Sequence, residues 1–199
     1  MYWYNGDIEW LEKKEVPNTS QKKVVFLGSS SFTRWETMEK DFKDFQAINL
    51  GFGGSTLAAC AWFYHRIVPR LQPDAIVIYA GDNDIGDGRT PEEVVIFYYQ
   101  LIDTIRKTLG NIPVCFVSIK LSPSRKHLKG SIEYANQCIR ESIERSKNNV
   151  HYIDIYPKML DKNGELKLNL YESDLLHLSP VGYLIWQKAI SSKLTSLLK

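Results

Sequence analysis

The chain has 199 residues, 44% of them apolar and 12% aromatic, a composition typical of one globular domain that folds without disulfides or metal. Lys and Arg number 25 against 23 Asp and Glu, so the formal charge of +2 gives no strong field that would favour nucleic acid as a partner. The three cysteines form no Cys-x-x-Cys pair, and no apolar run reaches the roughly 18 residues of a membrane span. We expect a soluble, cytoplasmic protein, with removal of a leader as the alternative.

Residues 1–23 lack clear periodicity and end in a polar stretch, so we predict an arm packed on a single domain of residues 24–199. After the arm, short apolar runs alternate with helical patterns. The runs predicted to be strands are 24–27, 47–50, 75–80, 114–119 and 150–155. The helical patterns cover about 32–42, 57–68, 91–109, 132–147 and 180–198. Continuous apolar strands that alternate with helices predict a parallel sheet with helices on both faces.

In such sheets ligands bind outside the carboxyl ends of the strands, so the loops there are the places to search for chemistry. The first strand ends in Gly-Ser-Ser-Ser at 28–31 and opens a helix. This turn either exposes a hydroxyl or is a serine-rich helix cap, and it lacks the lysine of a phosphate loop. The second strand ends in Gly-Phe-Gly-Gly at 51–54, which is not the dinucleotide-binding pattern.

The third strand is followed by Gly-Asp-Asn-Asp at 81–84, whose spacing does not fit a calcium loop. Asn83 either donates its amide to an anionic oxygen or caps a turn. After the fourth strand, the basic loop 121–130 either binds a polar or anionic substrate or is solvated.

The last loop holds Asp174 three residues before His177, just ahead of a helix. An aspartate in this place can orient an imidazole through its Nδ1–H, while a surface histidine is the alternative. No pair of histidines has zinc-ligand spacing.

A serine, potential oxyanion donors and an Asp-His pair thus meet at one edge of the predicted sheet. From about residue 24 to 198 the sequence resembles the SGNH hydrolases, the GDSL esterase/lipase family, with its four blocks in order. The resemblance implies a three-layer α/β/α flavodoxin-like fold with a five-stranded parallel sheet, and hydrolysis of carboxylic esters without metal or cofactor. It implies Ser30 as nucleophile, His177 as base and Asp174 as the residue that orients it. The N–H groups of Ser30 and Gly54 and the Asn83 side chain would be the oxyanion donors.

One departure from the family is plain, because its usual Gly-Asp-Ser is Gly-Ser-Ser here. Ser29 stands where the family has aspartate, and Ser29 and Ser31 are the alternatives to Ser30 as nucleophile. We further predict that Ser29, Arg125 and His127 contact the substrate.

No segment is long enough for a lid domain, so we expect a shallow cleft that prefers short acyl, acetyl-type esters of a polar alcohol such as a sugar. The aromatic residues 62–64 are the opposing signal, since they could build an acyl trough. A lysophospholipase or thioesterase of the same fold and a non-catalytic small-molecule binder are the alternative functions. The expected partner is a small-molecule ester, and a homodimer stays open.

Overall fold

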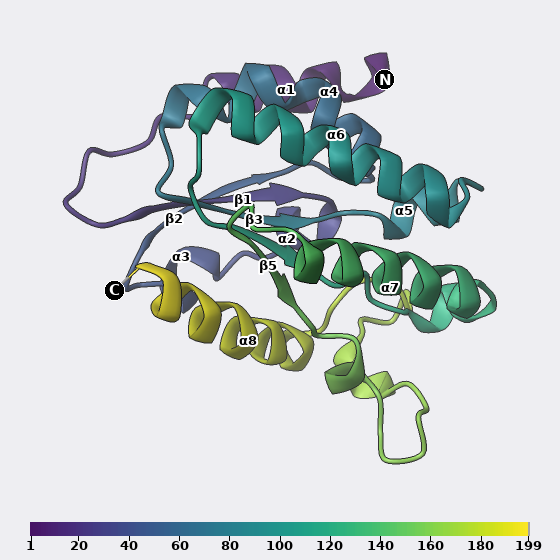
Figure 1. The fold of residues 1–199 in the computed structure, drawn as a ribbon. Coiled ribbons are helices and arrows are strands. Elements are labelled where there is room, and N and C mark those ends of the chain that lie inside the picture. The colour runs from purple at the N-terminus through teal and green to yellow at the C-terminus, as the bar shows by residue number, and fades with distance from the viewer. Residues whose placement is uncertain (199) are drawn as a thin grey trace.

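The protein folds around a parallel sheet with helices on both faces, as Figure 1 shows for residues 1–198, the part of the chain that this computed structural model describes. The sheet has the strand order β2-β1-β3-β4-β5. The strands are β1 (Lys23–Gly28), β2 (Gln46–Gly51), β3 (Ala75–Tyr79), β4 (Val114–Val117) and β5 (Val150–Ile153). The helices are α1 (Asn5–Glu12), α2 (Ser30–Thr33), α3 (Met38–Asp41), α4 (Leu57–Ile67), α5 (Asp82–Gly86), α6 (Pro91–Leu109), α7 (Lys129–Arg145) and α8 (Pro180–Leu198). The predicted α/β fold class is confirmed.

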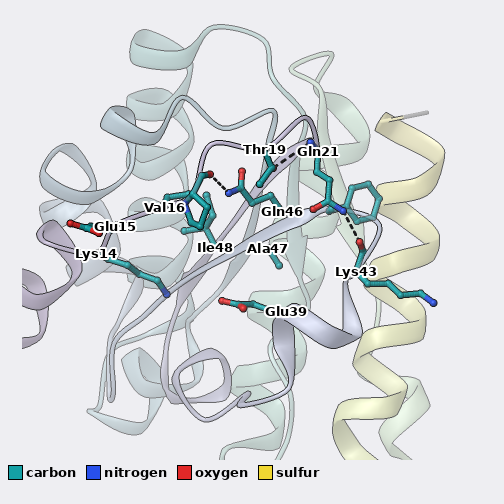
Figure 2. A pocket seen from close by; sticks show the side chains of 12 residues that line it. Lys14, Glu15, Val16, Thr19, Gln21, Glu39, Lys43, Gln46, Ala47 and Ile48 are labelled. Carbon is teal, nitrogen blue, oxygen red and sulfur yellow. Dashed lines mark hydrogen bonds between the residues drawn. The ribbon is translucent and has the colours of Figure 1, made fainter.

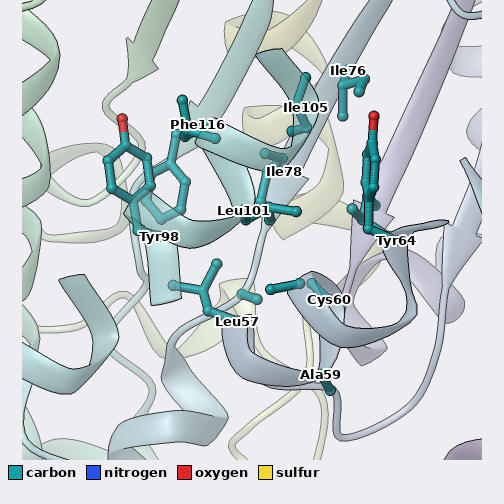
Figure 3. Close-up of a cluster of buried hydrophobic side chains, with 14 of the residues drawn as sticks. Leu57, Ala59, Cys60, Tyr64, Ile76, Ile78, Tyr98, Leu101, Ile105 and Phe116 are labelled. Carbon is teal, nitrogen blue, oxygen red and sulfur yellow. The ribbon is translucent and has the colours of Figure 1, made fainter. Parts of the chain in front are cut away.

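One face of the sheet is covered by α1, α4, α6 and α7 (Figure 1). Because strand side chains alternate between faces, every second residue of a strand belongs to this layer. Figure 3 shows Ile76 and Ile78 of β3 among side chains of α4 and α6, such as Tyr64 and Leu101. All four of these side chains are essentially inaccessible to solvent. Burial of their apolar area holds these helices to the sheet.

The opposite face is covered by α2, α3 and α8 and is rich in aromatic side chains. Phe32, Trp35 and Phe42 follow β1, and Trp186 of α8 packs among them. The ring centroids of Trp35 and Phe42 are 5.3 Å apart at an interplanar angle of 62°, the edge-on arrangement that aromatic pairs prefer. This layer fixes the segment that begins at the end of β1.

The helix predicted over 32–42 is wrong, because the structure has two short helices there, α2 and α3. The apolar spacing that suggested one helix reflects aromatic side chains packed under the sheet. Between the two helices, Trp35 Nε1 and Thr37 Oγ1 both donate to the Asp41 carboxylate, at 2.7 and 2.6 Å. Such side-chain bonds stabilise a turn at the expense of helix continuity. The predicted helices 91–109 and 180–198 match α6 and α8, and the Thr90–Glu93 capping box of α6 is present.

Two predicted strands, 114–119 and 150–155, extend two residues beyond the observed β4 and β5. The apolar pattern continues because Ile119 and Ile155 are buried, but side chains take over the backbone hydrogen bonds there. Asn136 of α7 bonds both the N–H and the carbonyl of Ile119, each at 2.8 Å. Ser118 Oγ accepts from the N–H of Ile155 at 2.9 Å. The chain therefore leaves the sheet while its side chains stay in the core.

Residues 1–23, for which the sequence predicts no regular element, contain the 3-10 turn Tyr2–Tyr4 and the helix α1. Tyr4, Ile8 and Leu11 are buried in the core layer that contains α4. None of the helices within residues 1–198 has both the length and the apolar character that a membrane crossing requires.

Candidate active site

Three loops meet at the carboxyl edge of the sheet because their strands are neighbours. β1 lies between β2 and β3, with Gly28 paired in register with Gly51 on one side and Tyr79 on the other. A Cβ at Gly28 would lie 2.0 Å from the Tyr79 carbonyl oxygen, so only glycine fits. The N–H of Phe52 donates to the Gly28 carbonyl at 2.9 Å, which ties the start of the second loop to the end of β1. The loop after β1 is thus flanked by the glycine loop after β2 and by α5 after β3.

Ser30, His177 and Asp174 form a continuous chain of hydrogen bonds at this edge. Ser30 is the first residue of α2, and its Oγ lies 2.9 Å from His177 Nε2. His177 Nδ1 lies 2.6 Å from Asp174 Oδ2. If the imidazole is neutral with its proton on Nδ1, it donates to the carboxylate and can accept the serine proton at Nε2. The three residues have the order and spacing of a nucleophile, its base and an orienting acid.

The turn that carries His177 is held by backbone bonds to its own ends and to the loop after β4. Tyr171 and Leu178 form an antiparallel bridge, and the N–H of Glu172 donates to the His177 carbonyl at 2.8 Å. Leu175 has a φ of 56°, and its carbonyl accepts from the N–H of Ser124 at 3.0 Å. A strained residue in a turn that is fixed at both ends is typical of functional sites.

The carboxylate of Asp174 is held in its ionised form. Its hydrogen bond with the His177 ring, followed by those from the N–H groups of His177 and Leu176, keeps the pKa of Asp174 well below its usual range. Both N–H groups donate to Oδ1 at 2.9 Å, which leaves Oδ2 for the imidazole. Arg34, one helical turn after Ser30, places Nη1 3.5 Å from Oδ2. Since the Asp174 side chain is 40% exposed, this ion pair is screened by water.

The predicted oxyanion donors lie on either side of Ser30. Among residues 1–198, the N–H groups of Ser30 and Gly54 have no hydrogen-bond acceptor. Asn83, in α5, donates one Nδ2 proton to the Ser55 carbonyl at 3.0 Å. Its Oδ1 accepts from Arg125 Nη2 at 2.8 Å. The second Nδ2 proton remains for a ligand.

Two side chains outside the predicted set hold the glycine loop. Asp84 of α5 is fully buried, and its Oδ2 accepts from the N–H of Leu57, the first residue of α4, at 2.8 Å. Burial raises the pKa of Asp84 to about 6, against the opposing effects of that N–H and of Arg89. On the other side, the Tyr4 hydroxyl donates to the Gly54 carbonyl at 2.8 Å. The loop is therefore fixed both by α5 and by the N-terminal segment.

A buried cluster of charges adjoins Asn83. Asp82 Oδ2 is 2.9 Å from Lys120 Nζ and 3.3 Å from Arg125 Nη1. Burial acts to raise the pKa of Asp82, but the charges of Lys120 and Arg125 hold it below its ordinary value. The Tyr79 hydroxyl is a second partner of the Lys120 ammonium, at 3.2 Å.

Among the three adjacent serines, Ser30 is partly exposed, whereas Ser29 and Ser31 are fully buried. The Oγ atoms of Ser29 and Ser31 have no hydrogen-bond partner among the described residues. The structure thus brings only the middle serine to the imidazole, and it does not bring Ser29 to the surface as a substrate contact. Arg125 points inward to Asp82 and Asn83, while His127 is exposed on the 3-10 turn Pro123–Leu128.

Two hollows of the surface bear on where a substrate could bind. The one in Figure 2, about 340 Å³, runs between residues 14–21 and the edge strand β2 and contains none of the predicted site residues. The other, about 540 Å³, borders the triad at Asp174. It is lined by polar side chains such as Arg34 and Glu172 and by less polar ones such as Trp35 and Leu178.

The sequence analysis missed the roles of Tyr4, Arg34, Asp84 and Lys120. For Lys120 there was a signal, because a lysine flanked by Ile119 and Leu121 at a strand end is an unusual place for a charge. Tyr4 and Arg34 had none, since their partners lie 50 and 140 positions away along the chain.

The carboxyl edge of the parallel sheet carries Ser30, His177 and Asp174 in hydrogen-bond contact, an arrangement that resembles the relay of serine hydrolases. The chain matches the model of the GDSL-like lipase/acylhydrolase family over residues 25–185, and it belongs to this family. It is therefore an ester hydrolase of the GDSL type, as the sequence predicts.

Solved structures agree in fold. A candidate acylhydrolase from Bacteroides fragilis has a TM-score of 0.82 at 21% identity, with 100% of this chain and 97% of that one covered. A carbohydrate esterase of family 3 from Talaromyces cellulolyticus has a TM-score of 0.74 at 16% identity, with 88% and 97% covered. An acetyl xylan esterase has a TM-score of 0.71 at 21% identity, with 89% and 100% covered. A comparison with curated proteins gave no match.

Proposed function

We propose that the protein hydrolyses short acyl esters of a polar alcohol with Ser30 as nucleophile, His177 as general base and acid, and Asp174 as the residue that orients it. The observation that carries the proposal is the relay itself, 2.9 Å from Ser30 Oγ to Nε2 and 2.6 Å from Nδ1 to Asp174. Free serine is a poor nucleophile, so Oγ must lose its proton to Nε2 as it attacks the carbonyl carbon. The imidazolium that forms is stabilised by the ionised Asp174.

In the next steps the negative charge on the carbonyl oxygen is first stabilised, and its electron pair then re-forms the carbonyl double bond. The unpaired N–H groups of Ser30 and Gly54 and the free Nδ2 proton of Asn83 are the donors suited to this oxygen. When the tetrahedral intermediate collapses, the bond to the alcohol breaks and Nε2–H gives its proton to the leaving oxygen. Water then attacks the acyl-serine with the same base, which releases the acid and restores Ser30.

Packing supports a short acyl group. Of the aromatic residues 62–64, Phe63 and Tyr64 are buried in the core, while Trp62 is 70% exposed. Two of the three aromatic side chains that could have built an acyl trough are therefore part of the core. Each methylene left in water forgoes about 0.8 kcal/mol of binding, so long acyl chains would gain little.

The hollow beside the triad supports a polar alcohol. Arg34, Glu172 and Ser173 line it next to Asp174, and the side chains of Trp35 and Tyr183 form an aromatic part of its wall. Sugar hydroxyls find both donors and acceptors among such side chains. The similarity in fold to a carbohydrate esterase and to an acetyl xylan esterase agrees with this choice.

The test combines active-site labelling with a substrate series. A fluorophosphonate should label Ser30, with labelling lost in Ser30→Ala and kept in Ser31→Ala, whose hydroxyl is buried. An adduct mapped to Ser29 or Ser31 would overturn the assignment.

For the substrate, kcat/KM should be highest for acetyl or butyryl p-nitrophenyl esters and for acetylated sugars. A steady rise of kcat/KM from two to twelve acyl carbons would favour a lipase or lysophospholipase instead. Faster turnover of acyl thioesters than of the matching oxygen esters would favour a thioesterase. Ligand binding that persists in Ser30→Ala, without turnover in the parent, would point to a binding protein.

A further inference from the structure

The Asn83 side chain is held between two partners that each allow only one orientation of its amide. The Ser55 carbonyl can only accept, so the atom 3.0 Å from it must be Nδ2. The Arg125 guanidinium can only donate, so the atom 2.8 Å from Nη2 must be Oδ1. Together they leave one Nδ2 proton with a fixed direction.

We propose that Arg125 is a positioning residue for ester hydrolysis, which orients and polarises the Asn83 amide so that its free Nδ2 proton faces the oxyanion. The inference rests on the oxyanion role proposed above for Asn83. It differs from the substrate contact that the sequence suggested for Arg125, because the guanidinium points into the protein and not toward a ligand.

The position of the Arg125 side chain is itself fixed by neighbouring groups. Its Nη1 lies 3.3 Å from Asp82 Oδ2, and the Asp82 carboxylate is fixed from its other side by Lys120 at 2.9 Å. Gly86, the last residue of α5, lets the guanidinium lie against the backbone, since a Cβ there would be 3.0 Å from Cζ. The Arg125 side chain is 18% exposed and that of Lys120 only 2%. A planar guanidinium fits this position better than the flexible ammonium of a lysine would.

The charges of this cluster have the sign that the reaction needs. Two cations, Lys120 and Arg125, face one carboxylate, Asp82, so the cluster carries one excess positive charge, and it contacts the amide through Arg125. A hydrogen bond from the guanidinium to Oδ1 draws electron density toward the oxygen and makes the Nδ2 protons better donors. Both effects grow as negative charge develops on the substrate carbonyl, so they act on the transition state more than on bound ester.

The experiment is a double-mutant cycle on hydrolysis of p-nitrophenyl acetate, a neutral ester that offers no charge for Arg125 to bind. Arg125→Gln should lower kcat by roughly 10-fold or more with KM nearly unchanged, less than the roughly 100-fold to 1,000-fold cost of losing an entire oxyanion donor in Asn83→Ala. Arg125→Lys, which keeps the charge but not the planar fork, should recover part of the loss. In an Asn83→Ala background, Arg125→Gln should change kcat by less than about 2-fold, because it acts through the amide.

Lys126→Gln is the matched control. Lys126 is the next residue of the same turn, and it forms an exposed pair with Glu165. Its substitution should leave kcat unchanged. If Arg125→Gln does not fold, as judged by its thermal transition, Gly86→Ala serves in its place. The added Cβ would lie 3.0 Å from Cζ and so shift the guanidinium slightly without removing a charge, which should lower kcat in the same direction.

The outcomes separate the inference from the proposed function. If Arg125→Gln raises KM and leaves kcat unchanged, Arg125 binds substrate directly and the inference is wrong. The inference is also wrong if the fold-losses of kcat from Arg125→Gln and Asn83→Ala multiply in the double variant. It is wrong as well if Lys126→Gln lowers kcat as much as Arg125→Gln does. If Asn83→Ala itself retains full kcat, the oxyanion role of Asn83 fails and the inference falls with it. If only Asn83→Ala is impaired, the inference alone fails.

Discussion

The buried carboxyl of Asp84 should make the stability of the protein depend on pH in a way that one substitution can reveal. The side chain is fully buried, and burial raises its pKa from 3.8 to about 6. Between these values the folded protein keeps a proton that the unfolded chain releases. The free energy of unfolding therefore falls as pH rises from about 4 to about 7, because the folded state binds more protons there. A difference of roughly two pKa units corresponds to about 3 kcal/mol.

The measurement compares urea unfolding of the parent with that of Asp84→Asn at several pH values. The amide does not titrate, so the free energy of unfolding of the variant minus that of the parent should increase by about 2.4 kcal/mol between pH 4 and pH 7, with the rest of the effect below pH 4. Any constant cost of the substitution, such as a weaker bond to the Leu57 N–H, cancels in this comparison.

Asp74 provides a control of opposite sign. Partial burial acts to raise its pKa, but hydrogen bonds from Lys22 and from the N–H of Lys23 hold that pKa below its ordinary value. This carboxylate contributes stability that is lost as pH falls, so for Asp74→Asn the same difference should decrease as pH rises through the acidic range. If the difference for Asp84→Asn stays flat between pH 4 and pH 7, the reasoning about burial is refuted.

Three further predictions concern the parts that hold the site together. Gly28→Ala should destabilise the protein by at least about 3 kcal/mol in urea unfolding, because its Cβ would collide with the Tyr79 carbonyl, and a loss below 1 kcal/mol would contradict the close approach of the strands. Tyr4→Phe should cost about 1 kcal/mol of stability and lower kcat, since it removes the hydroxyl bond to the Gly54 carbonyl; unchanged kcat would separate the N-terminal segment from the site. Asp174→Asn should lower kcat by orders of magnitude with the thermal transition retained, and a variant with parental kcat would exclude the relay.

Residues near each other in the sequence gave most of what could be predicted. The helix α6 was predicted with its bounds because the Thr90–Glu93 box, a proline at the first helical position and an apolar stripe all act within one segment. Asp174 and His177 could be paired for the same reason, since they are three positions apart. The order of strands and helices limited the sheet to a parallel one, and so placed the chemistry at its carboxyl edge.

The tertiary structure decided what depends on residues distant in sequence. Periodicity indicated one helix where α2 and α3 are separate, because aromatic packing produces the same spacing as a helical stripe. Arg125 looked like a substrate contact until the fold placed Asp82 and Asn83 against it, 43 and 42 positions earlier in the chain. The local sequence could not show these contacts, because a hydrogen bond depends on the distance and direction between atoms, and for residues far apart in the chain only the fold sets these. Local propensity thus determined the strands, the long helices and their order, while packing of the sheet edge determined which charged groups face the candidate site and which face each other.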